Sequence, residues 1–374
     1  MSAVAALLGS RRIARGGGRT LMVDDRPFLN FAGCNYLALG DRSELREVAH
    51  KAIDDGVPFS RYLVRDYGGY DEPFERVEAA AAEFYGTEAA VYLPSGYLIG
   101  AAGFAGLRPE YDVLVLDEMA HWCLADAATL SDAAVKTFRH ADCDDLERVL
   151  SELEGQRPLV VSDGVFATTG ELPPLDRYYA LAESRDGHLF VDESHAAGVV
   201  GPNGRGAIDH FGLGARAHVG TTLSKGLCGH GSVFVGSGEQ VARARATRAL
   251  RGSSPGSPIS ALVSATAMDI VRQTPELPAA LRDKSSSLRK QLQALGLAIV
   301  DTPASIIAFA EGDFDHMRRL QSMLFDTGIY VLHSNYIAAG PGGMIRLSVF
   351  ADHTDEDFQR VCDVIDRWRG ANPA

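Results

Sequence analysis

Short, uninterrupted apolar segments alternate with amphipathic stretches between residues 41 and 275. Such segments are typical of strands covered on both faces, and helices between them imply right-handed crossovers in a mostly parallel sheet. We therefore expect an α/β domain that binds its ligand at the carboxyl ends of the strands. The expected strands are AAVYL (89–93), DVLVLD (112–117), AVKTF (134–138), PLVVSD (158–163), HLFVD (188–192), HVGTTL (218–223) and SVFVG (232–236).

The pattern changes toward both ends of the chain. Residues 1–40 are expected to form an arm, with a helix-like start, a break at the glycines 16–18 and a hairpin that turns at Asp24 and Asp25. Residues 240–278 are expected to be helical except at GSSPGSP (252–258). A smaller α+β domain is expected over 279–374, after an arm (1–40) and a large α/β domain (41–278). Its elements would be helices over 283–295, 313–327 and 355–368 and strands at IIAFA (306–310) and MIRLSVF (344–350).

Composition narrows the class of protein. The chain has 36 Lys and Arg against 49 Asp and Glu, a net charge of −13, and its basic residues are scattered. This balance disfavours nucleic acid or an anionic membrane as the main partner. The five cysteines are odd in number and form no CxxC pair, which indicates a reduced cytoplasmic protein rather than a disulfide framework or a zinc site. We accordingly expect no metal. The first residues have a short apolar stretch followed by arginines, the reverse of a signal peptide's order, and no later run reaches the ~18 apolar residues that span a membrane, so we expect neither a signal peptide nor a membrane span.

Two charged residues follow neighbouring predicted strands. Asp192 ends HLFVD, and Lys225 follows HVGTTL one crossover later, so both should reach the same edge of the sheet. Taken singly, Asp192 could be a helix cap and Lys225 a surface cation. Taken together, a buried lysine can condense with an aldehyde, and a facing acid can keep a pyridine nitrogen protonated. The pair therefore indicates an enzyme that uses pyridoxal 5′-phosphate (PLP).

Several segments resemble, in the same order along the chain, segments of the α-oxoamine synthases, which are PLP enzymes of fold type I. DESHAAGVVGPNGRG, which begins at Asp192, is similar to the family's DEAHSxGxxGxxGRG, and TTLSKGLCGHGS is similar to its lysine segment. Further similar segments are GRTLMVDDRPFLNFAGCNYLALG, DEMAHWCLADA, SDGVFATTGELPPL and MIRLSVFADHT. The resemblance runs through nearly the whole chain and implies a large domain with a mostly parallel sheet followed by a smaller α+β domain.

The resemblance also implies roles for individual residues. Lys225 would hold the cofactor as a Schiff base, Asp192 would pair with the pyridine nitrogen, and His195 would bond the phenolic oxygen. His121 would stack on the ring, the alternative being a core or surface histidine. The remaining cofactor-binding residues would be Ser95, Gly96, Tyr97, Asp163, Thr222 and Ser224, with Ser253 and Ser254 reaching the neighbouring subunit's phosphate. Arg346 would clamp the substrate carboxylate, the alternative being a surface ion pair, and Asn35 would also contact substrate.

Some positions depart from the family pattern. Cys34-Asn35-Tyr36 replaces Asn-Asp-Tyr, a bulky stretch over 59–69 replaces a glycine-rich one, and Ala167 and Thr169 replace Ser and Asp. These positions surround the amino-acid or acyl group in the family. The ring chemistry is therefore expected to be kept, while the substrates are left open.

The resemblance implies a homodimeric cytoplasmic enzyme with shared active sites that joins an amino acid to an acyl thioester. The product would be an α-amino ketone, usually formed with loss of carbon dioxide. Two alternatives stay open. One is another PLP reaction at Cα, such as aldol cleavage, elimination or transamination, because fold does not fix chemistry. The other is a non-catalytic partner subunit.

Overall fold

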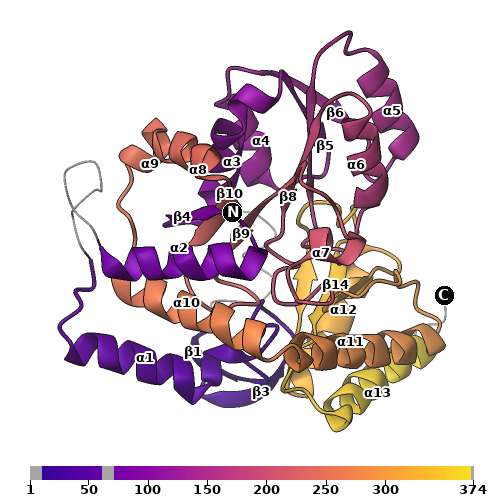
Figure 1. Cartoon of the computed structure of the whole chain (residues 1–374). Helices are drawn as coiled ribbons and strands as arrows, with labels where there is room; N and C mark the ends of the chain where they lie inside the picture. The colour runs from indigo at the N-terminus through magenta and orange to yellow at the C-terminus, as the bar shows by residue number, and fades with distance from the viewer. Residues whose placement is uncertain (1–10, 61–70, 372–374) are drawn as a thin grey trace. The chain divides into compact units, whose positions relative to one another are not determined.

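The computed structural model describes residues 11–60 and 71–371 and divides into two compact units (Figure 1). The first unit contains the residues up to Asp41, the short segment Ala167–Glu171 and the residues from Ala279 onward. The second contains Arg42–Phe166 and Leu172–Pro278. The bulky stretch over 59–69, where the sequence departs from the family pattern, lies mostly outside the described residues.

A seven-stranded sheet in the order β4-β10-β9-β8-β7-β5-β6 forms the centre of the second unit. Every pairing among β9, β8, β7, β5 and β6 is parallel, whereas β10 runs antiparallel to β9 and to β4. All seven predicted strands are present within one residue at each end, so the mostly parallel sheet is confirmed. Their bounds are β4 Ala89–Leu93, β5 Val113–Asp117, β6 Ala134–Phe138, β7 Pro158–Asp163, β8 His188–Asp192, β9 Ala217–Thr222 and β10 Ser232–Gly236.

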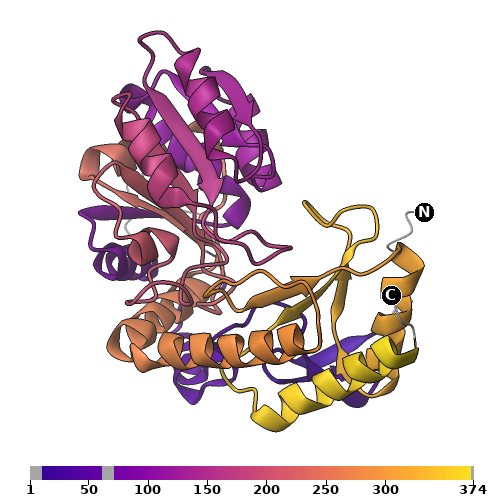
Figure 2. The same cartoon turned by 90° about the vertical axis from the view of Figure 1, so that its right-hand side faces the viewer.

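Helices cover both faces of this sheet (Figures 1 and 2). One face carries α3 (Ile99–Gly106), α4 (Trp122–Thr129) and α8 (Gly238–Arg245), and the other carries α5 (Cys143–Ser151), α6 (Leu175–Glu183) and α7 (Ala207–Phe211). The helices α1 (Ser43–Asp54), α2 (Glu72–Tyr85) and α10 (Pro258–Gln273) pack together, and α9 (Arg248–Arg251) follows α8. Short 3₁₀ turns at Gly96–Leu98 and Arg108–Glu110 flank α3.

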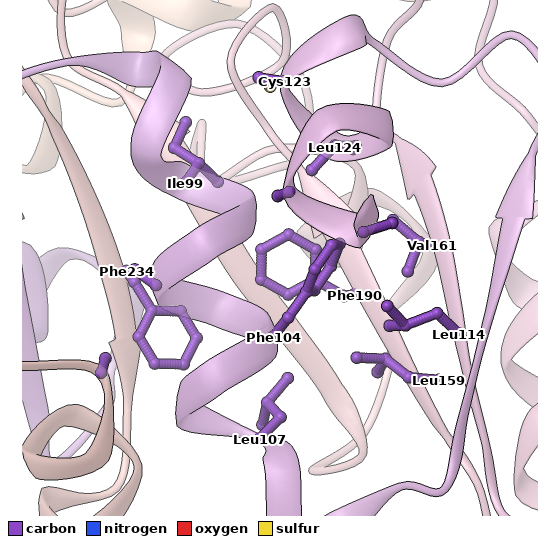
Figure 3. Packing of buried hydrophobic residues seen from close by; sticks show 14 of the residues in the cluster. Ile99, Phe104, Leu107, Leu114, Cys123, Leu124, Leu159, Val161, Phe190 and Phe234 are labelled. Carbon is purple, nitrogen blue, oxygen red and sulfur yellow. The ribbon is translucent and has the colours of Figure 1, made fainter. Parts of the chain in front are cut away.

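Alternation along β8 explains why the strand is apolar throughout. Phe190 points to the α3 face and packs edge-on against Phe104 at 5.5 Å between ring centroids (Figure 3), while Leu189 and Val191 join the core on the opposite face. The ring leaves no room on α3, because a Cβ at Gly103 would lie 2.2 Å from its Cε2 atom. The strand that ends in Asp192 is therefore held by packing on both sides.

Two small sheets form the first unit. One has the order β1-β2-β3-β12 and the other β11-β14-β13. The predicted hairpin is confirmed: β2 and β3 pair antiparallel across Asp24 and Asp25, both with positive φ, as a two-residue hairpin turn requires. Strand bounds are β1 Ile13–Gly16, β2 Thr20–Val23, β3 Arg26–Asn30, β11 Ile306–Phe309, β12 Ile329–Tyr330, β13 Leu332–Ser334 and β14 Met344–Ser348.

The helices of this unit follow the amphipathic pattern. They are α11 (Glu276–Ala294), α12 (Phe314–Asp326) and α13 (Asp355–Ala371), and a short 3₁₀ turn at Leu39–Asp41 follows β3. The helix-like start predicted for the arm is wrong where the chain is described, because residues 13–16 form β1 and pair with β2. Pairing with a neighbouring strand outweighs local helix preference there. The first ten residues lie outside the description.

Two further findings concern the whole of the described chain. All five cysteines are free. Within residues 11–60 and 71–371, none of the helices is long and apolar enough to cross a membrane.

Candidate active site

Lys225 lies in the loop that joins β9 to its antiparallel neighbour β10. Its Nζ atom is 2.8 Å from Nε2 of His195, which is buried just after the end of β8. The loop packs closely on the His195 segment, because a Cβ at Gly226 would come 2.5 Å from the carbonyl oxygen of Ala197. The structure therefore brings together two of the predicted residues at the carboxyl end of the sheet.

Two buried carboxylates lie side by side at this edge. Asp163 ends β7 and Asp192 ends β8, and the two residues are direct partners in the parallel register. The backbone N–H of Ser194 donates to Oδ1 of Asp192 at 2.9 Å, and the Cys123 thiol donates to Oδ2 at 3.7 Å. Burial raises the pKa of Asp163 well above its usual range, and the neighbouring charge of Asp192 raises it further. The pair can thus hold a proton that an isolated aspartate would lose.

His121 caps the amino terminus of α4. Its Nδ1 accepts a hydrogen bond from the backbone N–H of Cys123 at 3.2 Å, and its own backbone N–H donates to Asp163 at 2.9 Å. Burial lowers the pKa of the imidazole, so the neutral ring is favoured. The accepting role of Nδ1 places the proton of that neutral ring on Nε2.

A set of hydroxyl and backbone groups lies at the start of the 3₁₀ turn before α3. Gly96 approaches Thr222 so closely that a Cβ there would be 3.2 Å from both Cβ and Oγ1 of the threonine. The Thr222 and Ser224 hydroxyls are 2.8 Å apart. Ser95 accepts a hydrogen bond from the Tyr97 backbone N–H at 3.2 Å through its hydroxyl. Hydroxyls and the amino end of a helical segment together provide donors for an anion such as phosphate.

The two predicted substrate residues belong to the first unit. Arg346 on β14 is buried, and its guanidinium donates to the Ala167 carbonyl oxygen at 2.7 Å, the Ser348 hydroxyl at 3.1 Å and the Tyr36 hydroxyl at 3.1 Å. Asn35 is half-buried and accepts from the Gly40 backbone N–H at 3.5 Å. Arg346 is therefore a buried cation rather than a surface ion pair, and it touches the 34–36 segment, where the sequence departs from the family pattern.

Ser253 and Ser254 follow α9 in the second unit. The Ser253 hydroxyl donates to the Ala249 carbonyl oxygen within its own helical turn, and Ser254 is exposed. That these two serines reach the cofactor of a second subunit stays a prediction.

Three residues around Asp192 were not singled out from the sequence. Cys123 donates to its carboxylate, the hydroxyl of Ser194 accepts from the Thr222 backbone N–H at 3.0 Å, and Glu193 is fully buried. Glu193 accepts from the backbone N–H groups of Ala207 and Ile208 at 2.8 Å each, while burial raises its pKa to about 8. All three stand within two residues of a predicted site residue, and that adjacency was the available signal.

This arrangement fits PLP. Lys225 offers a primary amine for the aldehyde, Asp192 a buried carboxylate for a protonated pyridine nitrogen, and the space beside Gly96 lacks the Cβ that would fill it. Buried carboxylates are costly unless a cation meets them, and a pyridinium would supply one.

Comparison with known proteins agrees with the geometry. Residues 26–365 match the family model for aminotransferase class I and II. The 8-amino-7-oxononanoate synthase 1 of Bacillus velezensis is 30% identical over 352 residues, which cover 93% of this chain and 90% of that protein. The 8-amino-7-oxononanoate synthase of Symbiobacterium thermophilum is 31% identical over 345 residues, 91% of this chain and 88% of its own.

Solved structures show the same fold. Serine palmitoyltransferase from Sphingomonas wittichii matches with a TM-score of 0.88 and 26% identity, over 97% of this chain and 92% of its own. The 8-amino-7-oxononanoate synthase from Francisella tularensis matches with a TM-score of 0.77 and 20% identity, over 93% of this chain and 99% of that chain.

Proposed function

Because the chain belongs to the aminotransferase class I and II family and, within it, to the α-oxoamine synthases, we propose that it condenses an amino acid with an acyl thioester. The product is an α-amino ketone, usually formed with loss of carbon dioxide. The observation that carries this proposal is the convergence of Lys225, His195 and the Asp163–Asp192 pair at the carboxyl edge of one sheet.

The enzyme depends on PLP. When bound, the cofactor draws electrons away from Cα of the attached amino acid, so that Cα can lose a proton and attack a carbonyl group. The surrounding residues decide how well this happens.

The site residues of the second unit have distinct roles. The Nζ of Lys225 would hold the cofactor through its aldehyde carbon and would carry a proton to or from the substrate. The Asp192 carboxylate, oriented by Ser194 and Cys123, would keep a proton on the pyridine nitrogen. His121 would contact the ring, and His195, which already contacts Lys225, would also bind the phenolic oxygen.

The first unit contributes to substrate binding through Arg346 and Asn35. The guanidinium is already held by Tyr36, Ser348 and the Ala167 carbonyl oxygen. A substrate carboxylate would therefore bind by sharing or displacing the Tyr36 hydroxyl. Cys34, two residues before this tyrosine in the sequence, replaces the family's asparagine. We propose that this replacement changes which amino acid the enzyme accepts.

A panel of amino acids and acyl thioesters tests the reaction class. Serine with a palmitoyl thioester is one starting pair, since a structural neighbour is named for it. We expect free thiol and α-amino ketone in a ratio of one to one with at least one pair, measured by a thiol reagent and by mass spectrometry. If no thioester releases thiol while one amino acid is cleaved, deaminated or transaminated, the acyltransferase proposal is wrong and another reaction at Cα replaces it.

A second measurement separates an enzyme from a non-catalytic subunit. We expect purified protein to hold PLP, and borohydride reduction to fix it to the peptide that contains Lys225. Lys225→Ala should abolish turnover and this fixation. Attachment at any other lysine would contradict the assignment.

We further propose a cytoplasmic homodimer with shared active sites, supported by the resemblance of the 252–258 segment and by the frequency of two-fold assemblies. Sedimentation should give twice the chain mass. Mixing Lys225→Ala with a Ser253→Ala, Ser254→Ala double variant should restore some activity if the serines serve the partner's site. A fully active monomer would contradict the proposal.

A further inference from the structure

At the end of the strands opposite to Lys225, three potential metal ligands come together. His188 opens β8, His218 lies near the start of β9, and Glu110 closes the 3₁₀ turn after α3. One ligand atom from each lies within 4.8 Å of the others. Because β8 rises about 3.3 Å per residue, His188 is roughly 13 Å from Asp192, and this cluster is separate from the candidate active site.

The strand register explains why both imidazoles share one face of the sheet. His218 pairs with Phe190 in the parallel register, and His188 precedes Phe190 by two residues. Side chains two apart along a strand point the same way, so both rings lie on the α3 face. The rings stack with centroids 5.0 Å apart, and Nδ1 of His188 is 2.8 Å from Nε2 of His218.

The carboxylate of Glu110 is held in place by α8. Its Oε1 accepts from Arg243 at 2.7 Å, and both of its oxygens accept from the Gln240 side-chain amide, at 3.0 and 2.9 Å. Outer partners of this kind orient a carboxylate that binds a metal. Glu110 and His188 are half-buried and His218 is buried, so two of the three ligand residues keep some exposure to solvent.

From these contacts we propose that Glu110, His188 and His218 bind one divalent transition-metal ion, with Zn²⁺ as the natural occupant. Two imidazoles and one carboxylate suit Zn²⁺, Co²⁺ or Ni²⁺, whereas Mg²⁺ and Ca²⁺ prefer oxygen ligands alone. Three protein ligands leave a fourth position for water. The sequence predicted no metal, because its cysteine spacing was the signal tested and these three ligands lie far apart along the chain.

Binding requires a small local rearrangement. A tetrahedral Zn²⁺ about 2.0–2.2 Å from each ligand atom sets those atoms roughly 3.3 Å apart, so the Glu110 carboxylate must approach the rings. The ring that donates in the His188–His218 hydrogen bond must move its proton to its other nitrogen, which frees both lone pairs for the ion. The ion would then tie the end of α3 to β8 and β9.

The experiment uses the full-length holoenzyme after treatment with a chelator. The protein is dialysed against Zn²⁺ with a weak competing chelator, and metal per chain is measured by mass spectrometry. Co²⁺ titration followed by visible absorption reports an ordered site. We expect wild type to bind one ion more per chain than His188→Gln or Glu110→Gln, and these variants to bind at least tenfold more weakly, since even loss of an outer partner costs 10–100-fold.

The exposed His50 on α1 supplies the matched control, because His50→Gln removes an imidazole without touching the cluster. Metal should also raise the thermal midpoint of wild type and of His50→Gln but not of His188→Gln. The proposal is overturned if wild type binds no more Zn²⁺ than His188→Gln, or if Co²⁺ produces the same spectrum in both. These readouts do not depend on turnover, so they stand apart from the proposed acyltransferase activity.

Discussion

Replacing Asp163 by asparagine tests the electrostatics of the buried carboxylate pair. Asp163 and Asp192 are partners in neighbouring parallel strands, which lie about 4.8 Å apart. Two unit charges roughly 5 Å apart at an effective dielectric constant of about 20 repel by about 3 kcal/mol. This repulsion acts in addition to burial, and both raise the pKa of Asp163.

The sign of the pH dependence follows from that shift. With its pKa raised in the folded state, Asp163 keeps a proton that the unfolded chain releases near pH 4. The stabilisation from this proton is complete below about pH 4 and is lost as the pH rises toward the raised value, by at most about 1.4 kcal/mol per pH unit. Asp163→Asn has the shape of the protonated acid and can still accept from the His121 backbone N–H. We expect it to flatten this dependence and to cost less than about 1 kcal/mol at pH 7.

Hydrogen exchange of peptides covering β7 and β8 is the assay, since it reports the second unit alone. It should be followed from pH 5 to pH 9, with and without PLP, because a pyridinium beside Asp192 weakens the repulsion. Asp192→Asn should flatten the stability profile only in part, since it removes the repulsion but leaves Asp163 buried, and it should abolish turnover, which Asp163→Asn should largely keep. Parallel profiles for wild type and Asp163→Asn would refute the reasoning.

Three further predictions concern single contacts. Cys123→Ala removes the thiol donor to Asp192 and should lower kcat/KM about fivefold, the equivalent of about 1 kcal/mol, whereas Cys123→Ser should keep most of the activity. Arg346→Ala removes the hydrogen bonds that the guanidinium donates to the Ala167 carbonyl oxygen and the Tyr36 hydroxyl, so it should lower the thermal midpoint of the first unit as well as raise KM for the amino acid. An unchanged midpoint would contradict the packing role. Phe190→Ala should lower the free energy of unfolding of the second unit by about 3–5 kcal/mol, measured by urea unfolding. The control Phe59→Ala, at an exposed position, should cost about 0.5 kcal/mol or less. Similar costs for the two variants would be inconsistent with the core described.

Much of the fold could be predicted because strand burial leaves a strong pattern. An apolar run such as PLVVSD is long enough for a buried strand and too short for a helix, and all seven such runs became strands. The reversed direction of β10 could not be predicted from hydrophobicity, which is the same for either direction. The strand at residues 13–16 was missed because its partner β2, and not its own sequence, determines its conformation.

The candidate site was predictable where residues follow adjacent strands. Asp192 and the Lys225 loop meet because β8 and β9 are consecutive and parallel, and the resemblance added His195 and His121. Contacts that depend on the register were not predictable. The pairing of Asp163 with Asp192 is one such contact, and the meeting of Glu110 with the two histidines is another.

The antiparallel direction of β10 also bears on how the chain folds. Parallel strands need a crossover of a dozen or more residues, but β9 and β10 are joined through residues 223–231 and pair directly, with Thr222 opposite Ser232. Contacts between residues so close in sequence form early, since hairpins close in about 1–10 µs, whereas crossovers carry a larger entropic cost of loop closure. Lys225 therefore lies in the loop that connects one of the most local strand pairs of the sheet. We expect its loop to gain order before β7 and β8 bring the two aspartates together.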